Sequence, residues 1–187
     1  MRQCHPLSLP RLWLVSDARN DAVLERAIAR LPRGSGLIFR HYHLPPGERR
    51  ARFAVLARSI HARGGVAVLA GNMALARRWG ADGAYGAPGL VGPGGRGLRL
   101  VTTHSLREIA RARRVRADAL LLSPAFATRS HPGAAGLGVV RWRLLARRGC
   151  LTVVALGGMD GARARRLGAQ AWAAIDGLSP VRAACAT

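Results

Sequence analysis

Lysine is absent from this 187-residue sequence, and all 30 of its basic residues are arginines. Schiff-base catalysis and general-base catalysis by lysine are therefore excluded. Cysteine is scarce, because only Cys4, Cys150 and Cys185 occur and they lie far apart. They form no metal-binding or disulfide pattern, so we expect a reducing, cytoplasmic location. No apolar run approaches the ~18 residues of a membrane-spanning helix, and Pro6 and Pro10 interrupt any signal-peptide core.

Acidic and aromatic residues are also few. Nine acidic residues leave a formal net charge of +21, and aromatic residues make up 5% of the chain. The arginines lie mostly in helix-like segments at outward spacing, as in Arg111, Arg113 and Arg114, and aromatic residues do not alternate with them. We interpret them as solvated helix faces and do not expect nucleic acid as a partner. The charge favours anionic small molecules such as phosphorylated substrates.

Short apolar runs alternate with helical stretches along the whole chain. An apolar fraction of 49% is ample for a core, and the length suits one domain. Continuous apolar runs of this length are typical of parallel strands buried on both faces. We predict an α/β protein, a single (β/α)8 TIM barrel over residues 11–180 with a loose N-terminal segment 1–10; a six-stranded open sheet is the alternative. The predicted strands are residues 12–16, 36–40, 66–70, 83–86, 98–102, 119–123, 151–156 and 171–175.

Two of the connections carry specific expectations. Residues 21–31 have the pattern of an amphipathic helix, with Asn20 as its N-cap. Residues 86–97, GAPGLVGPGGRG, are rich in glycine and proline, which disfavour helix by ~1–3 kcal/mol per residue. We therefore expect a loop at this fourth connection.

Polar or glycine-rich clusters follow three of the later strands. They are Thr102-Thr103-His104-Ser105, the segment 123–133 and Gly157-Gly158. In a (β/α)8 barrel the active site is built at the carboxyl ends of the strands, so these clusters predict a site there. A second reading holds for the first cluster, because Ser105 with Glu108 forms a helix capping box and leaves His104 a structural role.

These three clusters resemble motifs of the thiamine-phosphate synthase family, which includes TenI-like members. The segments TTHS, SPAFATRSHPG and ALGG stand where the family carries "STHS", "GPxFPTxTK" and "GIGG". The resemblance implies an enzyme that joins a hydroxymethylpyrimidine diphosphate to a thiazole phosphate and releases diphosphate. It also implies a homo-oligomer assembled through barrel faces.

The resemblance also implies the site residues. Arg40 matches the arginine of the family's "QxRxK" trio, and Tyr42 stands at its lysine. His131 replaces another lysine in the loop after the sixth strand. His41 and His43 alternate with Tyr42, so we expect one of them to face the site and the other a helix. The implied catalytic residues are Arg40, Thr128, Ser130 and His131, and the implied substrate- or phosphate-binding residues are Arg40, Tyr42, Asn72, Thr102, Thr103, Thr128, Ser130, Gly157 and Gly158.

The family's magnesium-binding acids have no counterpart in the sequence. Ala70 and Gly71 stand where the family has "ND", and the connection 86–97 contains no acid. Mg²⁺ normally requires one or two carboxylates beside the substrate phosphates. We therefore predict no metal site in the protein and expect Mg²⁺ to arrive only with a substrate diphosphate. Asp17 is the one free carboxylate expected to reach the barrel mouth, and a turn-forming role is its alternative. Asp176 follows the eighth strand, where the resembled family completes its phosphate site, and its carboxylate would repel a phosphate at close range.

Two functions remain open at this point. The first is a synthase, whose chemistry depends on charge stabilisation and positioning. The second is a diverged, non-catalytic barrel of the same family that binds a phosphate or thiazole phosphate. The related thiazole tautomerases use a histidine early in the loop after the sixth strand, and here Ser123-Pro124 stands in its place.

Overall fold

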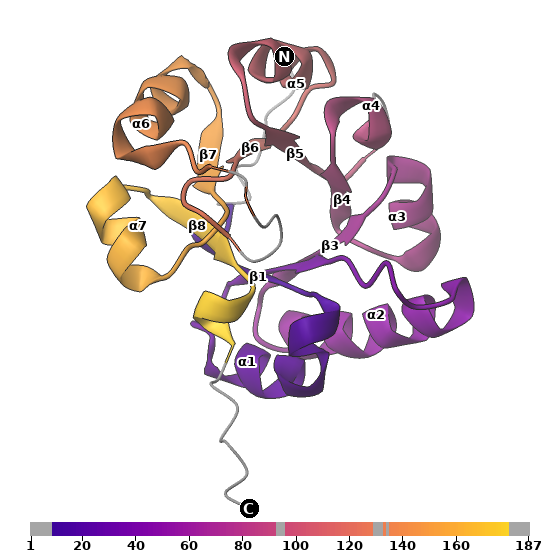
Figure 1. The fold of residues 1–187 in the computed structure, drawn as a ribbon. Helices are drawn as coiled ribbons and strands as arrows, with labels where there is room; N and C mark the ends of the chain where they lie inside the picture. The colour runs from indigo at the N-terminus through magenta and orange to yellow at the C-terminus, as the bar shows by residue number, and fades with distance from the viewer. Residues whose placement is uncertain (1–8, 93–95, 129–132, 134, 180–187) are drawn as a thin grey trace, which may run out of the picture.

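The chain folds as a closed barrel of eight parallel strands surrounded by helices (Figure 1). This computed structural model describes residues 9–92, 96–128, 133 and 135–179. Each strand pairs with the next in chain order, and β8 closes onto β1. The predicted (β/α)8 barrel is confirmed, and the open-sheet alternative is wrong. The strands are β1 (Leu12–Val15), β2 (Gly36–Phe39), β3 (Val66–Ala70), β4 (Gly83–Gly86), β5 (Leu98–Thr103), β6 (Ala119–Leu122), β7 (Thr152–Ala155) and β8 (Ala171–Ala174).

The helices form a ring outside the barrel (Figure 1). Among the described residues, no helix is long and apolar enough to cross a membrane. The expectation of a loose N-terminal segment falls mostly on residues 1–8, which lie outside the described part of the chain. The helices are η1 (Ala18–Val23), α1 (Leu24–Arg30), α2 (Pro46–His61), α3 (Met73–Trp79), α4 (Pro88–Val91), α5 (Leu106–Arg114), α6 (Gly138–Arg148), α7 (Gly161–Leu167) and η2 (Asp176–Leu178).

Two of the predicted connections are corrected by the structure. The helix expected over 21–31 begins earlier, as the 3₁₀ helix η1, and its N-cap is Asp17 and not Asn20. The stretch 86–97 was expected to lack helix but contains the one-turn helix α4. Pro88 occupies its first turn, where a missing N–H breaks no helical hydrogen bond.

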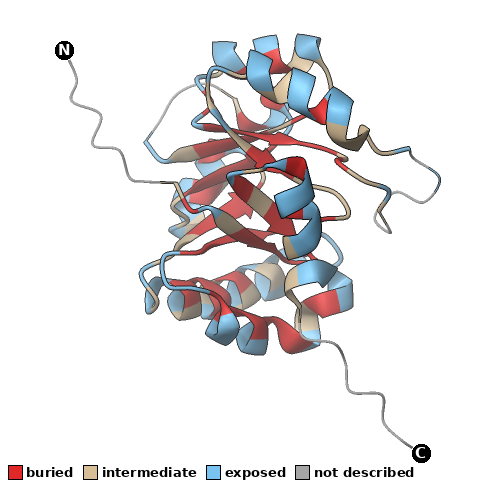
Figure 2. Ribbon diagram, turned by 90° about the vertical axis from the view of Figure 1, so that its left-hand side faces the viewer, coloured by how far each residue is buried: buried red, intermediate tan, exposed pale blue. Residues whose placement is uncertain are grey.

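The strands bury side chains on both of their faces, as continuous apolar runs require. Alternate residues such as Trp13, Ile38 and Leu100 fill the barrel interior. The residues between them, such as Leu14 and Leu37, pack outward against the helices. Figure 2 shows this buried centre with exposed residues along the outer helix surfaces.

A large aromatic side chain inside the barrel depends on a glycine in the neighbouring strand. Trp13 is fully buried, and its indole N–H donates to the carbonyl of Pro10. A Cβ placed on Gly36 would lie 2.1 Å from Cε3 of Trp13, so β2 can carry only glycine here. The interior of the barrel is therefore filled by side chains.

Candidate active site

A cavity of about 920 Å³ opens at the carboxyl ends of the strands. Its walls come from the segments that follow β2 and β4 to β8, together with Arg19 from η1. This is the end of a (β/α)8 barrel at which active sites are found. The predicted site residues that line the cavity are Arg40, Tyr42, Thr102, Thr128, Gly157 and Gly158.

Arg40 and Tyr42 reach the cavity from the turn after β2. The backbone N–H of Arg40 donates to Oγ of Ser16 at 2.8 Å, which holds this turn against the end of β1. The guanidinium carbon of Arg40 lies 5.6 Å from the centre of the Tyr42 ring. Burial raises the pKa of Tyr85, on the cavity wall, to about 12, although the charge of Arg40 acts in the opposite direction.

Arg49 of α2 holds the ends of β2 and β3 together from outside the cavity. It donates to the carbonyl of Arg40 at 2.9 Å and to that of Ala70 at 2.8 Å. Its guanidinium carbon lies 5.4 Å from the Tyr42 ring and 5.3 Å from the Trp79 ring, and burial lowers its pKa. The position of Arg40 is therefore fixed by a half-buried cation that no sequence motif identifies.

Gly157 and Gly158 let the loop after β7 pack directly on the loop after β6. Their φ angles are +96° and +61°, in the region that favours glycine. A Cβ on Gly157 would lie 2.7 Å from Cα of Pro124, and one on Gly158 would lie 2.4 Å from the carbonyl oxygen of Ala127. These glycines thus place the segment that ends at Thr128 on the cavity wall.

Arg163 of α7 covers these two glycines. Its guanidinium donates to the carbonyl of Gly158 at 2.6 Å and lies 5.4 Å from the ring of Phe126. Asp160 caps α7 by accepting from the N–H of Arg163 at 2.8 Å. That N–H is therefore already bonded to a carboxylate.

Among the described residues, three arginines and two acids set the charge of the cavity. Arg19, Arg40 and Arg163 contribute the positive charge, while Asp160 and Asp176 lie on the β7–β8 side. Arg19 lies 3.5 Å from Asp176, and Nε of Arg163 lies 3.7 Å from Asp160. The negative charge of each carboxylate is thus offset by a nearby arginine. On the β2 side of the cavity, Arg40 contributes positive charge.

Asp17 does not line the cavity and has instead the local structural role that the sequence left open for it. Its Oδ1 accepts from Nε of Arg19 at 2.9 Å and caps η1. Burial tends to raise the pKa of Asp17, but the hydrogen bonds from Arg19 outweigh it and leave that pKa below 3.8. Asp17 therefore orients Arg19, and Arg19 is the group that reaches the cavity.

Two predicted binding residues are not brought to the cavity. Thr103 is fully buried, and its Oγ1 has no hydrogen-bond partner within the described structure. Because side chains alternate along β5, Thr102 lines the cavity and Thr103 cannot. Asn72 instead caps α3, where its side chain accepts from the N–H of Leu75 at 2.8 Å.

The remaining sequence-predicted residues have other outcomes. Ser130 and His131 lie outside the described residues. His104 lines the cavity while its Nδ1 contacts the carbonyl of Ser123 at 2.6 Å, so it has the structural role that the sequence indicates. Neither His41 nor His43 is among the described residues that line the cavity, which corrects the expectation that one of them faces the site.

The arginines at positions 19 and 163 and the carboxylate of Asp160 were missed by the sequence analysis. Each lies within the first turn of a helix that follows a strand end or immediately before that turn. Charged residues three to seven positions after the predicted strand ends include all three of them.

The residues present do not fit the magnesium site that the resemblance implies. Beyond β3 and β4 the chain continues with Gly71, Asn72 and Ala87, which supply no carboxylate, and the amide oxygen of Asn72 is bonded to its own helix. Mg²⁺ requires oxygen ligands in octahedral geometry and usually takes them from carboxylates. The two acids of the cavity lie across it, each in contact with an arginine.

Known proteins resemble this chain in fold, and one family resembles it in sequence. Residues 100–179 match the family TMP-TENI, described as thiamine monophosphate synthase. A thiamine phosphate pyrophosphorylase from Pyrococcus furiosus superposes with a TM-score of 0.71 at 21% identity, over 90% of this chain and 86% of that one. One from Bacteroides thetaiotaomicron gives 0.58 at 14% identity, over 90% and 83%. An aldolase from Escherichia coli K12 gives 0.58 at 9%, over 88% and 74%. These structural likenesses show the fold alone, and no match is found among curated proteins.

Proposed function

We propose that the protein is a thiamine-phosphate synthase-like transferase. The premise is that residues 100–179 make it a TenI-like member of the thiamine monophosphate synthase family. It would join a hydroxymethylpyrimidine diphosphate to a thiazole phosphate and release diphosphate. The observation that carries the proposal is one cavity with guanidinium groups on two sides and a double-glycine loop beside one of them, Arg163. A cytoplasmic location is part of the same proposal.

The two phosphorylated substrates would occupy different walls of the cavity. Arg40 is placed to bind the diphosphate, since a guanidinium binds phosphate oxygens with two parallel hydrogen bonds. Thr102 and Thr128 offer hydroxyl groups on the adjoining wall, and Ser130 and His131 belong to the same proposed set. The backbone at Gly157 and Gly158, beside Arg163, would hold the thiazole phosphate.

The reaction needs positioning and charge stabilisation more than acid–base chemistry. The bond between the pyrimidine methylene carbon and the diphosphate oxygen breaks, and the bonding electrons leave with diphosphate. The thiazole nitrogen then donates its lone pair to the carbocation. Arg40 would stabilise the negative charge that develops on diphosphate, and the cavity would hold the nitrogen in line with the carbon.

A non-catalytic barrel that binds thiazole phosphate is the second candidate. The lack of a carboxylate beyond β3 and β4 in the described residues favours it, because the donor set for Mg²⁺ is missing. In this case the glycine loop binds phosphate without turnover, and Mg²⁺ does not affect binding.

One experiment separates the two candidates. The purified protein is incubated with both substrates, with and without Mg²⁺, and thiamine phosphate is measured. We expect product, and Arg40→Ala should lower turnover by about 10²–10³-fold, as for loss of one charge-stabilising donor. Arg58→Ala, at an exposed position of α2, is the matched control and should retain full turnover. Binding of thiazole phosphate without any product would establish the non-catalytic barrel, and turnover unchanged by Arg40→Ala would contradict the proposed role of Arg40.

A further inference from the structure

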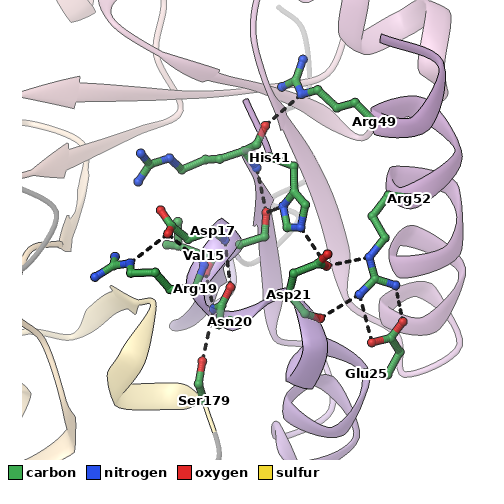
Figure 3. Close-up of polar contacts among 12 residues, drawn as sticks. Val15, Asp17, Arg19, Asn20, Asp21, Glu25, His41, Arg49, Arg52 and Ser179 are labelled. Atoms are coloured by element: carbon green, nitrogen blue, oxygen red, sulfur yellow. Dashed lines mark hydrogen bonds and ion pairs between the residues drawn. The ribbon is translucent and has the colours of Figure 1, made fainter. Parts of the chain in front are cut away.

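Three potential metal ligands meet outside the cavity. Asp21 of η1 and His41 and His43 of the turn after β2 each place one ligand atom within 4.8 Å of the other two. Figure 3 shows Asp21 and His41 directed toward one another, with Arg52 on the far side of Asp21. The rings of His41 and His43 lie 5.0 Å apart.

His41 is held in one orientation by its surroundings. It is 1% exposed and has a φ of +37°, a backbone conformation that residues other than glycine rarely adopt. Such conformations persist where the surrounding structure fixes them, and they are frequent at ligand sites. The ring also stacks on Phe39, with 4.7 Å between centroids.

The two ring nitrogens of His41 have different environments. Nδ1 lies 2.8 Å from Oγ of Ser16, the oxygen that also accepts from the N–H of Arg40. Nε2 lies 2.8 Å from Oδ1 of Asp21, yet this buried nitrogen has no partner with hydrogen-bond geometry among the described residues. In metal-binding histidines the second ring nitrogen is held by a hydrogen-bond partner, and Ser16 supplies such a partner to Nδ1 here.

The charges around Asp21 leave one of its oxygens available. Oδ1 also accepts from Nε of Arg52 at 2.8 Å. Both carboxylate oxygens of Glu25 contact Arg52, which offsets the charge of that guanidinium. Within the described structure, no group donates to Oδ2 of Asp21. A cation could therefore bind Oδ2 and leave the contact between Asp21 and Arg52 intact.

We propose that Asp21, His41 and His43 form a binding site for a divalent transition-metal ion of the Zn²⁺ class. Two imidazole nitrogens and one carboxylate oxygen, with water as a fourth ligand, match the ligand types and number that this ion takes. The site is separate from the proposed synthase reaction. A bound ion would fasten the turn that carries Arg40 and Tyr42 to η1, and so would stiffen one wall of the cavity.

The test uses the full-length protein, freed of metal and titrated with Zn²⁺ and with Co²⁺, whose visible absorption reports the ligand set. We expect one ion per chain. His43 is exposed, so His43→Ala should preserve the fold and weaken binding by more than the ~10–100-fold typical of a lost outer-shell partner. Ser16→Ala, which removes the outer-shell hydroxyl, should weaken it by ~10–100-fold.

His61 provides the matched control. It pairs with Asp82 at 2.7 Å on the surface and has no third metal ligand among the described residues. His61→Ala should bind as the wild type does, and Zn²⁺ should raise the melting temperature of both but not that of His43→Ala. The proposal is overturned if the wild type binds no ion, if His43→Ala binds with unchanged affinity, or if His61→Ala loses binding to the same extent.

Discussion

Gly158→Ala offers a quantitative test of how the glycine loop shapes the cavity. The φ of +61° costs a non-glycine residue ~1–2 kcal/mol. The added Cβ would also lie 2.4 Å from the carbonyl oxygen of Ala127, a backbone atom that can yield only if its loop moves. Overpacking of this kind costs typically ~1–3 kcal/mol. We therefore expect the free energy of unfolding to fall by ~2–5 kcal/mol in total.

Gly64→Ala separates the two contributions. Gly64 has a φ of +69°, and a Cβ there would meet nothing within 4 Å. It should lose only the conformational ~1–2 kcal/mol. Urea denaturation of both variants gives the two free energies, and their difference measures the contact with Ala127. Calorimetry should show that thiazole phosphate binds more weakly to Gly158→Ala and with wild-type affinity to Gly64→Ala. Equal stability of the two variants would refute the steric argument.

Two further predictions concern the ends of β1 to β3. Arg49→Lys keeps the charge but loses the planar guanidinium that joins the carbonyls of Arg40 and Ala70. The free energy of unfolding, measured by urea denaturation, should therefore fall by ~1–3 kcal/mol, and turnover in the product assay should fall with it. Unchanged turnover would show that Arg49 does not position Arg40. Burial lowers the pKa of His41 below 6.5, and Asp21 offsets this effect only in part. As the pH decreases below 6.5, the histidine therefore becomes protonated in the unfolded chain before it does so in the folded protein. The free energy of unfolding should fall over this range. The pKa of Asp21 lies below 3.8, so Asp21 does not contribute to the change in stability between pH 6.5 and 5. In His41→Gln the urea midpoint should therefore fall less over this range than in the wild type. An equal fall in both proteins would show that His41 is not the group responsible.

The sequence predicts the barrel because apolar periodicity is a local property. All eight strands lie within one or two residues of their predicted bounds, since continuous apolar runs such as LWLV and ALLL mark strands buried on both faces. The short helix α4 was missed because propensity penalises glycine and proline, whereas the first turn of a helix tolerates proline.

The site was less predictable because its geometry depends on contacts between distant segments. Arg49 reaches the cavity wall through the carbonyls of Arg40 and Ala70, and nothing in its own helix indicates this. The expectation that one histidine faces the site fails because His41 lies on the outer side with Phe39, on which it stacks, and contacts Asp21 of η1. The grouping of Asp21 with His41 and His43 is not visible in the sequence either, since these residues meet only in the folded barrel.

Closure of the barrel also constrains the order in which the protein can fold. Leu12 of β1 pairs with Trp172 of β8, about 160 residues later in the chain. During synthesis β1 is therefore made long before β8, its second neighbour in the sheet. β7 also lacks its second neighbour until β8 is made. Until β8 is made, both strands expose unpaired backbone groups that could pair with another chain. Protection of the nascent protein from aggregation therefore depends on β8, the last strand to be made. Because its pairing with β1 closes a very long loop, this pairing should be a late step of folding.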